Sequence, residues 1–228
     1  MQKFLKNALL IAALAATGAA SAAVITFDNV EPTVYSDGEA FVDGLNTLTA
    51  LGSNFAGATV GTSDRFACDM FVCPTGNASG FYMGLNDSGL SVKFTDGGPI
   101  RLKGLDYGFV LPVPMFIDAA VGRLQVTGIT SSGRISNISK DFSGQDANGD
   151  YRFTHWNIGG QFGQTDFTSI VFNACIYDAD GACSSQSMNL AQFAIDNIAV
   201  AVPEPSSWLL MGLGLLGLGA IARRQKSV

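Results

Sequence analysis

Short runs of apolar and β-branched residues recur along the middle of the chain, separated by Gly, Asp, Asn and Ser. Runs of this length between turn-forming residues predict β-strands. The eight strongest candidates are residues 24–30, 81–85, 90–95, 100–110, 124–130, 151–158, 167–173 and 193–200. A short helix is compatible with residues 36–49, and a short helix or a loop with residues 182–192. The pattern therefore predicts an all-β domain.

These strands are expected to form an antiparallel β-sandwich with a jelly-roll-like arrangement. Polar and apolar residues alternate from Arg123 to Thr127, as they do on a strand with one face in the core and one in solvent. Strong turn signals at residues 96–99 and 148–150 separate neighbouring strands. In such a fold, loops at one end of the sandwich would supply a binding site.

The first 23 residues have the features of a signal peptide. Lys3 and Lys6 precede an apolar stretch at residues 8–16, and small residues follow it. We expect signal peptidase to cleave after Ala22 or after Ala23 during export by the Sec machinery. The alternative is an uncleaved anchor, but the apolar stretch is much shorter than the roughly 20 residues that span a bilayer.

The last 27 residues differ in composition from the domain before them. They begin with the residues Val202, Pro203, Glu204 and Pro205. The two prolines favour an extended backbone. An apolar stretch follows at residues 208–222, and it predicts a transmembrane helix that is somewhat short for a bilayer. The basic residues after it, which would hold the C-terminus in the cytoplasm, are Arg223, Arg224 and Lys226.

The Val-Pro-Glu-Pro sequence, the Gly- and Leu-rich apolar stretch and the basic end resemble the PEP-CTERM sorting signal of exopolysaccharide-producing Gram-negative bacteria. The resemblance implies anchoring in the inner membrane and processing by an exosortase, a membrane-embedded enzyme. An ordinary C-terminal anchor with chance prolines is the alternative. Carriers of this signal have varied outer domains, so the resemblance implies a route and not an activity. We expect residues 24–201 to form one exported domain.

The net charge of this domain limits the classes of partner that it can bind. The two terminal segments hold five of the 13 Lys and Arg residues and one of the 19 Asp and Glu residues. Residues 24–201 therefore keep 8 basic and 18 acidic side chains, a net charge of about −10. Such a surface repels nucleic acid and anionic lipid. It tolerates neutral sugars and attracts divalent cations.

Four cysteines fall into two local pairs, Cys68 with Cys73 and Cys175 with Cys183. In an exported chain an even number of cysteines indicates disulfides. Three connectivities are possible, and the short spacings favour the two local pairs. A zinc site is disfavoured because His155 is the single histidine and the cysteine spacings do not match a zinc finger.

Carboxylates are the better candidates for metal ligands. Asp28 lies near the first predicted strand and Asp196 in the last, and such strands often lie side by side in a sandwich, so a calcium site between them is a hypothesis. Residues 146–150 begin like an EF-hand loop, but the required Gly and Glu further along are missing, so a turn is favoured. Residues 177–181 are interpreted as a turn in the same way.

Catalysis is not expected. A serine- or cysteine-based device would have to use His155, which is better interpreted as a hydrogen-bonded strand residue, and no Gly-x-Ser-x-Gly elbow is present. Aromatic residues could stack on sugars but are more simply interpreted as core; the candidates are Phe81, Tyr82, Tyr107, Tyr151 and Trp156. The closing strands, residues 167–172 and 193–198, resemble those of exported sandwich domains that include carbohydrate-binding modules.

These features together predict an exported protein of the cell surface or extracellular matrix, without catalytic activity and with polysaccharide as a candidate ligand. The alternative is a secreted hydrolase, similar to a glycosidase and acting on exopolysaccharide. That alternative requires two carboxylates that converge in a cleft.

Overall fold

The computed structural model describes residues 21–111, 121–184 and 189–202, and its regular structure is almost entirely β-strand. The strands are β1 (Ser21–Ile25), β2 (Val34–Tyr35), β3 (Ala40–Asp43), β4 (Asn46–Leu51), β5 (Gly57–Val60), β6 (Phe81–Gly84), β7 (Gly89–Phe94), β8 (Arg101–Phe109), β9 (Gly122–Ile129), β10 (Ile135–Asp141), β11 (Thr154–Asn157), β12 (Ser169–Tyr177), β13 (Cys183–Ser184) and β14 (Phe193–Val202). The helical elements are η1 (Phe66–Asp69), a 3₁₀ helix, and α2 (Gly160–Gln164), an α-helix.

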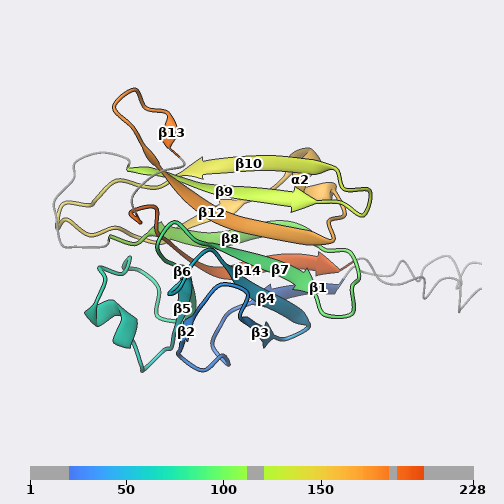
Figure 1. The fold of residues 1–228 in the computed structure, drawn as a ribbon, viewed down its shortest axis with the longest axis horizontal. Coiled ribbons are helices and arrows are strands. Elements are labelled where there is room, and N and C mark those ends of the chain that lie inside the picture. Colours follow the sequence, from blue (N-terminus) through green and yellow to red (C-terminus); the bar gives the residue numbers. More distant parts are fainter. Residues whose placement is uncertain (1–20, 112–120, 185–188, 203–228) are drawn as a thin grey trace, which may run out of the picture. The chain divides into compact units, whose positions relative to one another are not determined.

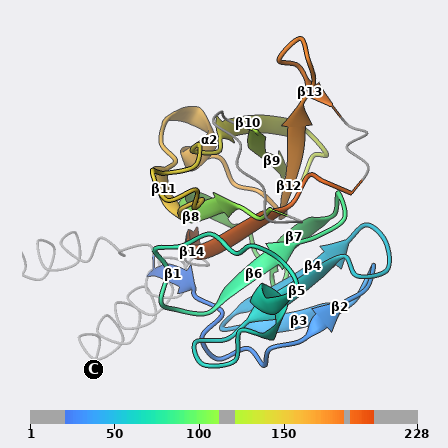
Figure 2. The ribbon, with the colours of Figure 1, turned by 90° about the vertical axis from the view of Figure 1, so that its left-hand side faces the viewer.

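The strands form two antiparallel sheets, which Figures 1 and 2 show from two directions. One sheet, here called the β14 sheet, has the order β11-β8-β14-β6-β5-β2, with β1 also paired to β14. The other, here called the β12 sheet, has the order β10-β9-β12-β7-β4-β3, with β13 also paired to β12. The chain passes repeatedly between the sheets, since β4 and β7 belong to one and β5 and β6 to the other. The predicted all-β class is therefore confirmed.

One core fills the space between the two sheets. Along β9, buried and half-buried positions alternate, so that Leu124 and Val126 face inward. Phe172 of β12 lies beside Val126 in the register and is fully buried. The β14 sheet contributes Tyr82 and Phe193, which are also fully buried. This alternation is what a strand with one buried face requires.

A second, smaller cluster lies on the outer face of the β14 sheet. Phe81 and Met83 of β6 point outward there and are covered by the segment that contains η1. The predicted disulfide between Cys68 and Cys73 is present in this segment, with the Cα atoms 5.4 Å apart. The disulfide thus secures the segment that shields part of this face from solvent.

Seven of the eight predicted strands are confirmed with shifted ends, whereas the stretch 24–30 overlaps β1 only at Val24 and Ile25. The helix considered at residues 36–49 is wrong, because this stretch forms the hairpin of β3 and β4. Gly44 turns the hairpin with a φ of 58°. Phe41 and Leu48 lie opposite each other and pack in the core, a pairing that two strands allow. In the stretch 182–192, Cys183 and Ser184 form β13, and residues 185–188 lie outside the described residues.

Replacing Gly122 with alanine should destabilise the sandwich. An added Cβ would lie 1.9 Å from the carbonyl oxygen of Cys175 in the neighbouring strand, and backbone atoms cannot move aside as a side chain can. We expect Gly122→Ala to lower the free energy of unfolding by about 1–3 kcal/mol, measured by denaturant titration. Gly159→Ala is the matched control, since its Cβ meets nothing within 4 Å. Equal midpoints for the two variants would contradict this packing.

Candidate functional site

The outer face of the β12 sheet carries uncharged polar side chains on adjacent strands. Because neighbouring residues of a strand point to opposite faces, the positions between the buried residues of β9 point outward. Thr127 of β9 lies opposite Asn137 of β10. Gln125 lies between Ser139 of β10 and Asn173 of β12. The register of three strands thus brings together side chains that are far apart in the sequence.

A hollow of about 340 Å³ opens on this face, and its lining consists of Gln125, Thr127, Asn137, Ile138 and Ser139. Thr127 Oγ1 donates a hydrogen bond to Asn137 Oδ1 at 2.8 Å. Asn173 Nδ2 donates to Gln125 Oε1 at 3.0 Å. Amides and hydroxyls can both donate and accept hydrogen bonds, so this lining complements an uncharged ligand rich in hydroxyl groups.

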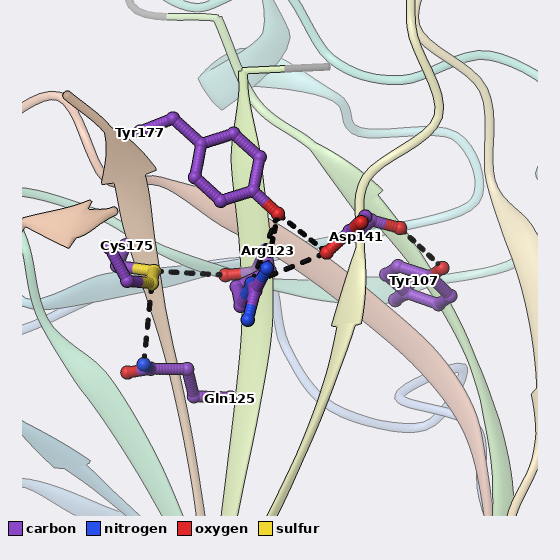
Figure 3. A network of polar contacts seen from close by, with 7 residues as sticks. Tyr107, Arg123, Gln125, Asp141, Cys175 and Tyr177 are labelled. Carbon is purple, nitrogen blue, oxygen red and sulfur yellow. Dashed lines mark hydrogen bonds and ion pairs between the residues drawn. A yellow bond between two sulfur atoms is a disulfide. The ribbon is translucent and has the colours of Figure 1, made fainter. Parts of the chain in front are cut away.

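A network of charged and phenolic groups lies at one end of this face (Figure 3). Arg123 Nε lies 3.2 Å from Asp141 Oδ1, and the guanidinium donates to the Tyr177 hydroxyl oxygen at 2.8 and 3.0 Å. The Tyr177 hydroxyl donates in turn to Asp141 Oδ1. Burial, followed by the bond to Asp141, raises the pKa of Tyr177, so the phenol stays protonated. The positive charge of Arg123 and the negative charge of Asp141 therefore neutralise each other.

The second predicted disulfide lies at the same end. It joins Cys175 of β12 to Cys183 of β13, with the Cα atoms 5.5 Å apart. Gln125 Nε2 donates to Cys183 Sγ at 3.4 Å, so a residue of the hollow contacts the disulfide directly. In Figure 1, β12 runs on into the loop before β13, which projects beyond the sheets.

A second polar cluster lies on the outer face of the β14 sheet. His155 of β11 faces Asp106 of β8, with Nδ1 and Oδ1 2.7 Å apart, and its Nε2 lies 3.1 Å from Asn157 Oδ1. Asp106 Oδ2 also accepts a hydrogen bond from Asn197 Nδ2 at 2.8 Å. The bond to Asp106, followed by the bond to Asn157, raises the pKa of His155. The histidine is therefore hydrogen-bonded at both ring nitrogens.

The two predicted calcium ligands, Asp28 and Asp196, both bond to residues of the segment Asn77–Gly80. Asp196 of β14 is fully buried, and its Oδ2 accepts hydrogen bonds from Asn77 Nδ2 at 2.8 Å and from Ser79 Oγ at 2.6 Å. Asp28 follows β1, which pairs with β14, and its Oδ1 accepts the Gly80 N–H at 2.7 Å. Burial above all, with the charge of Asp28 adding to it, raises the pKa of Asp196.

In the two acidic turns, residues 146–150 and 177–181, an Asp carboxylate accepts backbone N–H groups of the same turn or the residue after it. Asp146 Oδ1 accepts the N–H groups of Asn148 and Asp150, at 2.8 and 3.1 Å. Its Oδ2 bonds to Arg152 at 2.7 Å, the leading cause of the lowered pKa of Asp146. Asp178 likewise accepts two backbone N–H groups. Within the described residues, no group of three or more His, Cys, Asp or Glu side chains is arranged to hold a metal ion.

The aromatic residues considered as sugar platforms pack inside the protein. Phe81, Tyr82, Tyr107 and Tyr151 are at most 1% exposed. Trp156 is half-buried, and its ring centroid lies 6.0 Å from that of Tyr107. The interpretation of these residues as core is therefore confirmed.

The residues that line the hollow were not predicted from the sequence. The alternation in β9 indicated an outward polar face, but it did not show which strand lies beside it. That strand is β10, in which Ile135 and Ile138 are the two apolar residues among seven. The signal for β10 in the sequence was a weak alternation of apolar and polar residues in the stretch after β9.

Other predicted sites lie at or beyond the ends of the described chain. Ala22 and Ala23 lie in β1, and Val202 is the last residue of β14. Outside the described residues lie residues 1–20, the apolar stretch 208–222, and the site residues Pro203, Glu204, Pro205, Arg223, Arg224 and Lys226. In the part that is described, no helix is both long and apolar enough to cross a membrane.

The class of protein that this geometry defines is an all-β sandwich, and one solved structure has a similar fold. A DUF4465 family protein from Bacteroides caccae ATCC 43185 matches with a TM-score of 0.53 and 11% identity, over 80% of this chain and all of that chain. At this identity the likeness concerns the fold alone. The C-terminal family 22 carbohydrate-binding module of Clostridium thermocellum Xyn10B matches with a TM-score of 0.38 and 11% identity, over 80% of this chain and 94% of that one.

The C-terminal segment gives the more specific finding. Residues 201–225 match the PEP-CTERM protein-sorting motif, so the sorting signal predicted from the sequence is confirmed. The motif implies a secreted protein that is anchored in the membrane before it is processed, and it implies an exosortase as the processing partner. A search of curated proteins gives no match to this sequence.

Replacing Asp106 with asparagine should lower the pKa of His155 toward its ordinary value of 6.5, because the leading cause of the upward shift is removed. The chain has one histidine, so an NMR pH titration follows a single imidazole. Since folding raises this pKa, the stability that His155 contributes is present below pH 6.5 and is lost as the pH rises through the folded value.

The control for this titration is Asp166→Asn, which removes the partner of Arg101 and should leave His155 unchanged. A wild-type His155 that titrates at or below 6.5 would contradict the contact with Asp106.

Proposed function

We propose that the protein is a non-catalytic component of the cell surface or extracellular matrix that binds an uncharged polysaccharide on the outer face of the β12 sheet. The observation that carries this proposal is the hollow lined by amide and hydroxyl side chains, chiefly Gln125, Asn137 and Ser139. The sorting motif supports it, because an exosortase substrate is delivered to the outside of the cell, where polysaccharides are found.

The chemistry of the hollow suits a sugar better than an ion. Sugar hydroxyls donate and accept hydrogen bonds, as Gln125 and Asn137 do. None of the described residues that line the hollow is charged, and the excess of acidic residues in the domain disfavours anionic polymers. A neutral glycan therefore fits both the local and the overall charge.

The alternative of a secreted hydrolase has less support. Glycosidases use two carboxylates that both reach the glycosidic bond. Asp28 and Asp196 approach each other, but Asp196 is fully buried, so its oxygens are not open to a polymer. Asp106 and Asp146 are engaged with His155 and Arg152. These contacts favour structural roles for the acidic residues.

Removing two amides of the hollow should weaken glycan binding. Gln125→Ala combined with Asn137→Ala removes two hydrogen-bonding groups, each contributing roughly 0.5–1.5 kcal/mol, so we expect an affinity loss of about tenfold. Binding is measured on an array of neutral oligosaccharides and on exopolysaccharide extracted from the producing cells.

The matched control for the hollow is Gln161→Ala combined with Gln164→Ala, at exposed positions of α2. These changes should leave the affinity unaltered. Failure of the wild-type protein to bind any neutral glycan would contradict the proposal, as would equal affinities for the two double variants.

Replacing both prolines of the sorting motif should block processing. Pro203→Ala combined with Pro205→Ala removes the backbone restriction that favours an extended motif. We expect the tailed precursor to accumulate in the membrane fraction, with its mass measured after isolation from the native cell. Ser227→Ala, beyond the basic residues, should be processed normally. Normal processing of the double proline variant would count against recognition through this motif.

A further inference from the structure

Asp196 combines complete burial with an unsatisfied oxygen. None of the residue is exposed. Its Oδ2 accepts hydrogen bonds from Asn77 and Ser79, at 2.8 and 2.6 Å. Its Oδ1 is also buried, but no group in the described part of the chain bonds to it. Burying a carboxylate oxygen without a partner is costly, and native proteins pair such charges or use them to coordinate metals.

Protonation of Asp196 would not supply the missing partner. The Ser79 hydroxyl has one hydrogen and lies within hydrogen-bond distance of both Asp196 Oδ2 and Asn77 Oδ1, so a proton on Oδ2 can be donated to Ser79 Oγ. That arrangement still leaves Oδ1 without a donor within the described residues. A cation at Oδ1 meets the requirement.

Asp28 brings a second carboxylate to the same segment. It accepts the Gly80 N–H at 2.7 Å, while the preceding residue, Ser79, bonds to Asp196. The segments are closely packed, since a Cβ added at Gly80 would lie 2.8 Å from the Phe27 carbonyl oxygen. Neither carboxylate takes part in an ion pair with a described Lys, Arg or His. Two carboxylates are therefore held by one short segment, and neither is paired with a basic side chain of the described residues.

We propose that Asp28 and Asp196 hold a calcium ion, with Asp196 Oδ1 among its ligands. The described groups that can offer oxygen atoms to the ion are the two carboxylates and the Ser79 hydroxyl, while the Asn77 amide turns its nitrogen toward Asp196. Backbone carbonyls and water would complete the ligand shell. Calcium accepts six to eight oxygen ligands of these kinds in flexible geometry, so it does not require three acidic side chains. Zinc prefers thiolate and imidazole, and the four cysteines are in disulfides while the single histidine bonds to Asp106.

Such an ion joins the two ends of the exported domain. β1 has five residues and pairs with β14, the last strand before the sorting motif. Calcium would link the segment after β1, the strand β14 and the residues Asn77–Gly80. Two carboxylates give a modest affinity, with a Kd of about 10⁻⁴–10⁻³ M, the range of extracellular calcium modules. The ion would therefore bind outside the cell, where calcium reaches that concentration.

Calorimetric titration and thermal unfolding test this site in the full-length protein, purified in mild detergent. CaCl₂ should bind with one ion per chain, and 10 mM CaCl₂ should raise the Tm of the chelator-treated protein by about 3–10 °C. MgCl₂ at the same concentration should have a much smaller effect, because magnesium gives up its water ligands reluctantly.

Two substitutions locate the ion. Asp196→Asn removes the buried charge but can impair folding, so Asp28→Asn, at an exposed residue, is the deciding variant. It should keep the fold and weaken calcium binding by about tenfold or more, since the number of charged ligands sets the affinity. Asp69→Asn, at an exposed residue of η1, is the control and should bind as the wild type does. Absence of calcium binding by the wild type, or unchanged binding by Asp28→Asn, would overturn the proposal.

Discussion

Phe172 of β12 and Tyr82 of β6 lie on opposite sheets, and both are completely buried in the core between them. Burial of one face of each strand decides which side chains point outward, because a slip of one residue would exchange the two faces. In β9 such a slip would expose Val126 and bury Gln125. Exposing a buried aliphatic side chain costs about 1.5–3 kcal/mol, and burying an unpaired amide adds to that cost. The packing of the sheets therefore determines the composition of both outer faces.

The outer faces of the two sheets differ in the side chains that they carry. On the β14 sheet, the outward Phe81 and Met83 are apolar and need cover, which the segment around η1 provides. The disulfide between Cys68 and Cys73 closes a short loop in this cover. On the β12 sheet, the outward residues around Gln125 are polar and pair with one another across the strands. A face that satisfies its own hydrogen bonds can remain open to solvent and to a ligand.

Strongly apolar strands could be predicted from the sequence, and weakly apolar ones could not. The strands around Phe172 and Phe193 are recognisable because their inward residues form dense apolar patterns. β10 has few apolar residues, since it lies at a sheet edge with one face in solvent. Its position beside β9 depends on long-range pairing, and so does the hollow. The first and last strands of a sandwich often lie side by side, so the sequence could predict that Asp28 and Asp196 lie in the same region. It could not predict that both contact the segment Asn77–Gly80, which is about 50 residues from Asp28 in the sequence.

The distribution of acidic residues explains how a domain with a strong negative charge presents an uncharged surface. Asp146 and Asp178 accept backbone N–H groups within turns, and Asp37 accepts the Gly52 N–H between β2 and the end of β4. Carboxylates suit these positions because backbone donors at turns need acceptors. These three carboxylates lie at the connections between strands, while the outer face of β9 and β10 at the hollow keeps amides and hydroxyls. An anionic polymer would be repelled at the loops, whereas a neutral one could reach the hollow without that barrier.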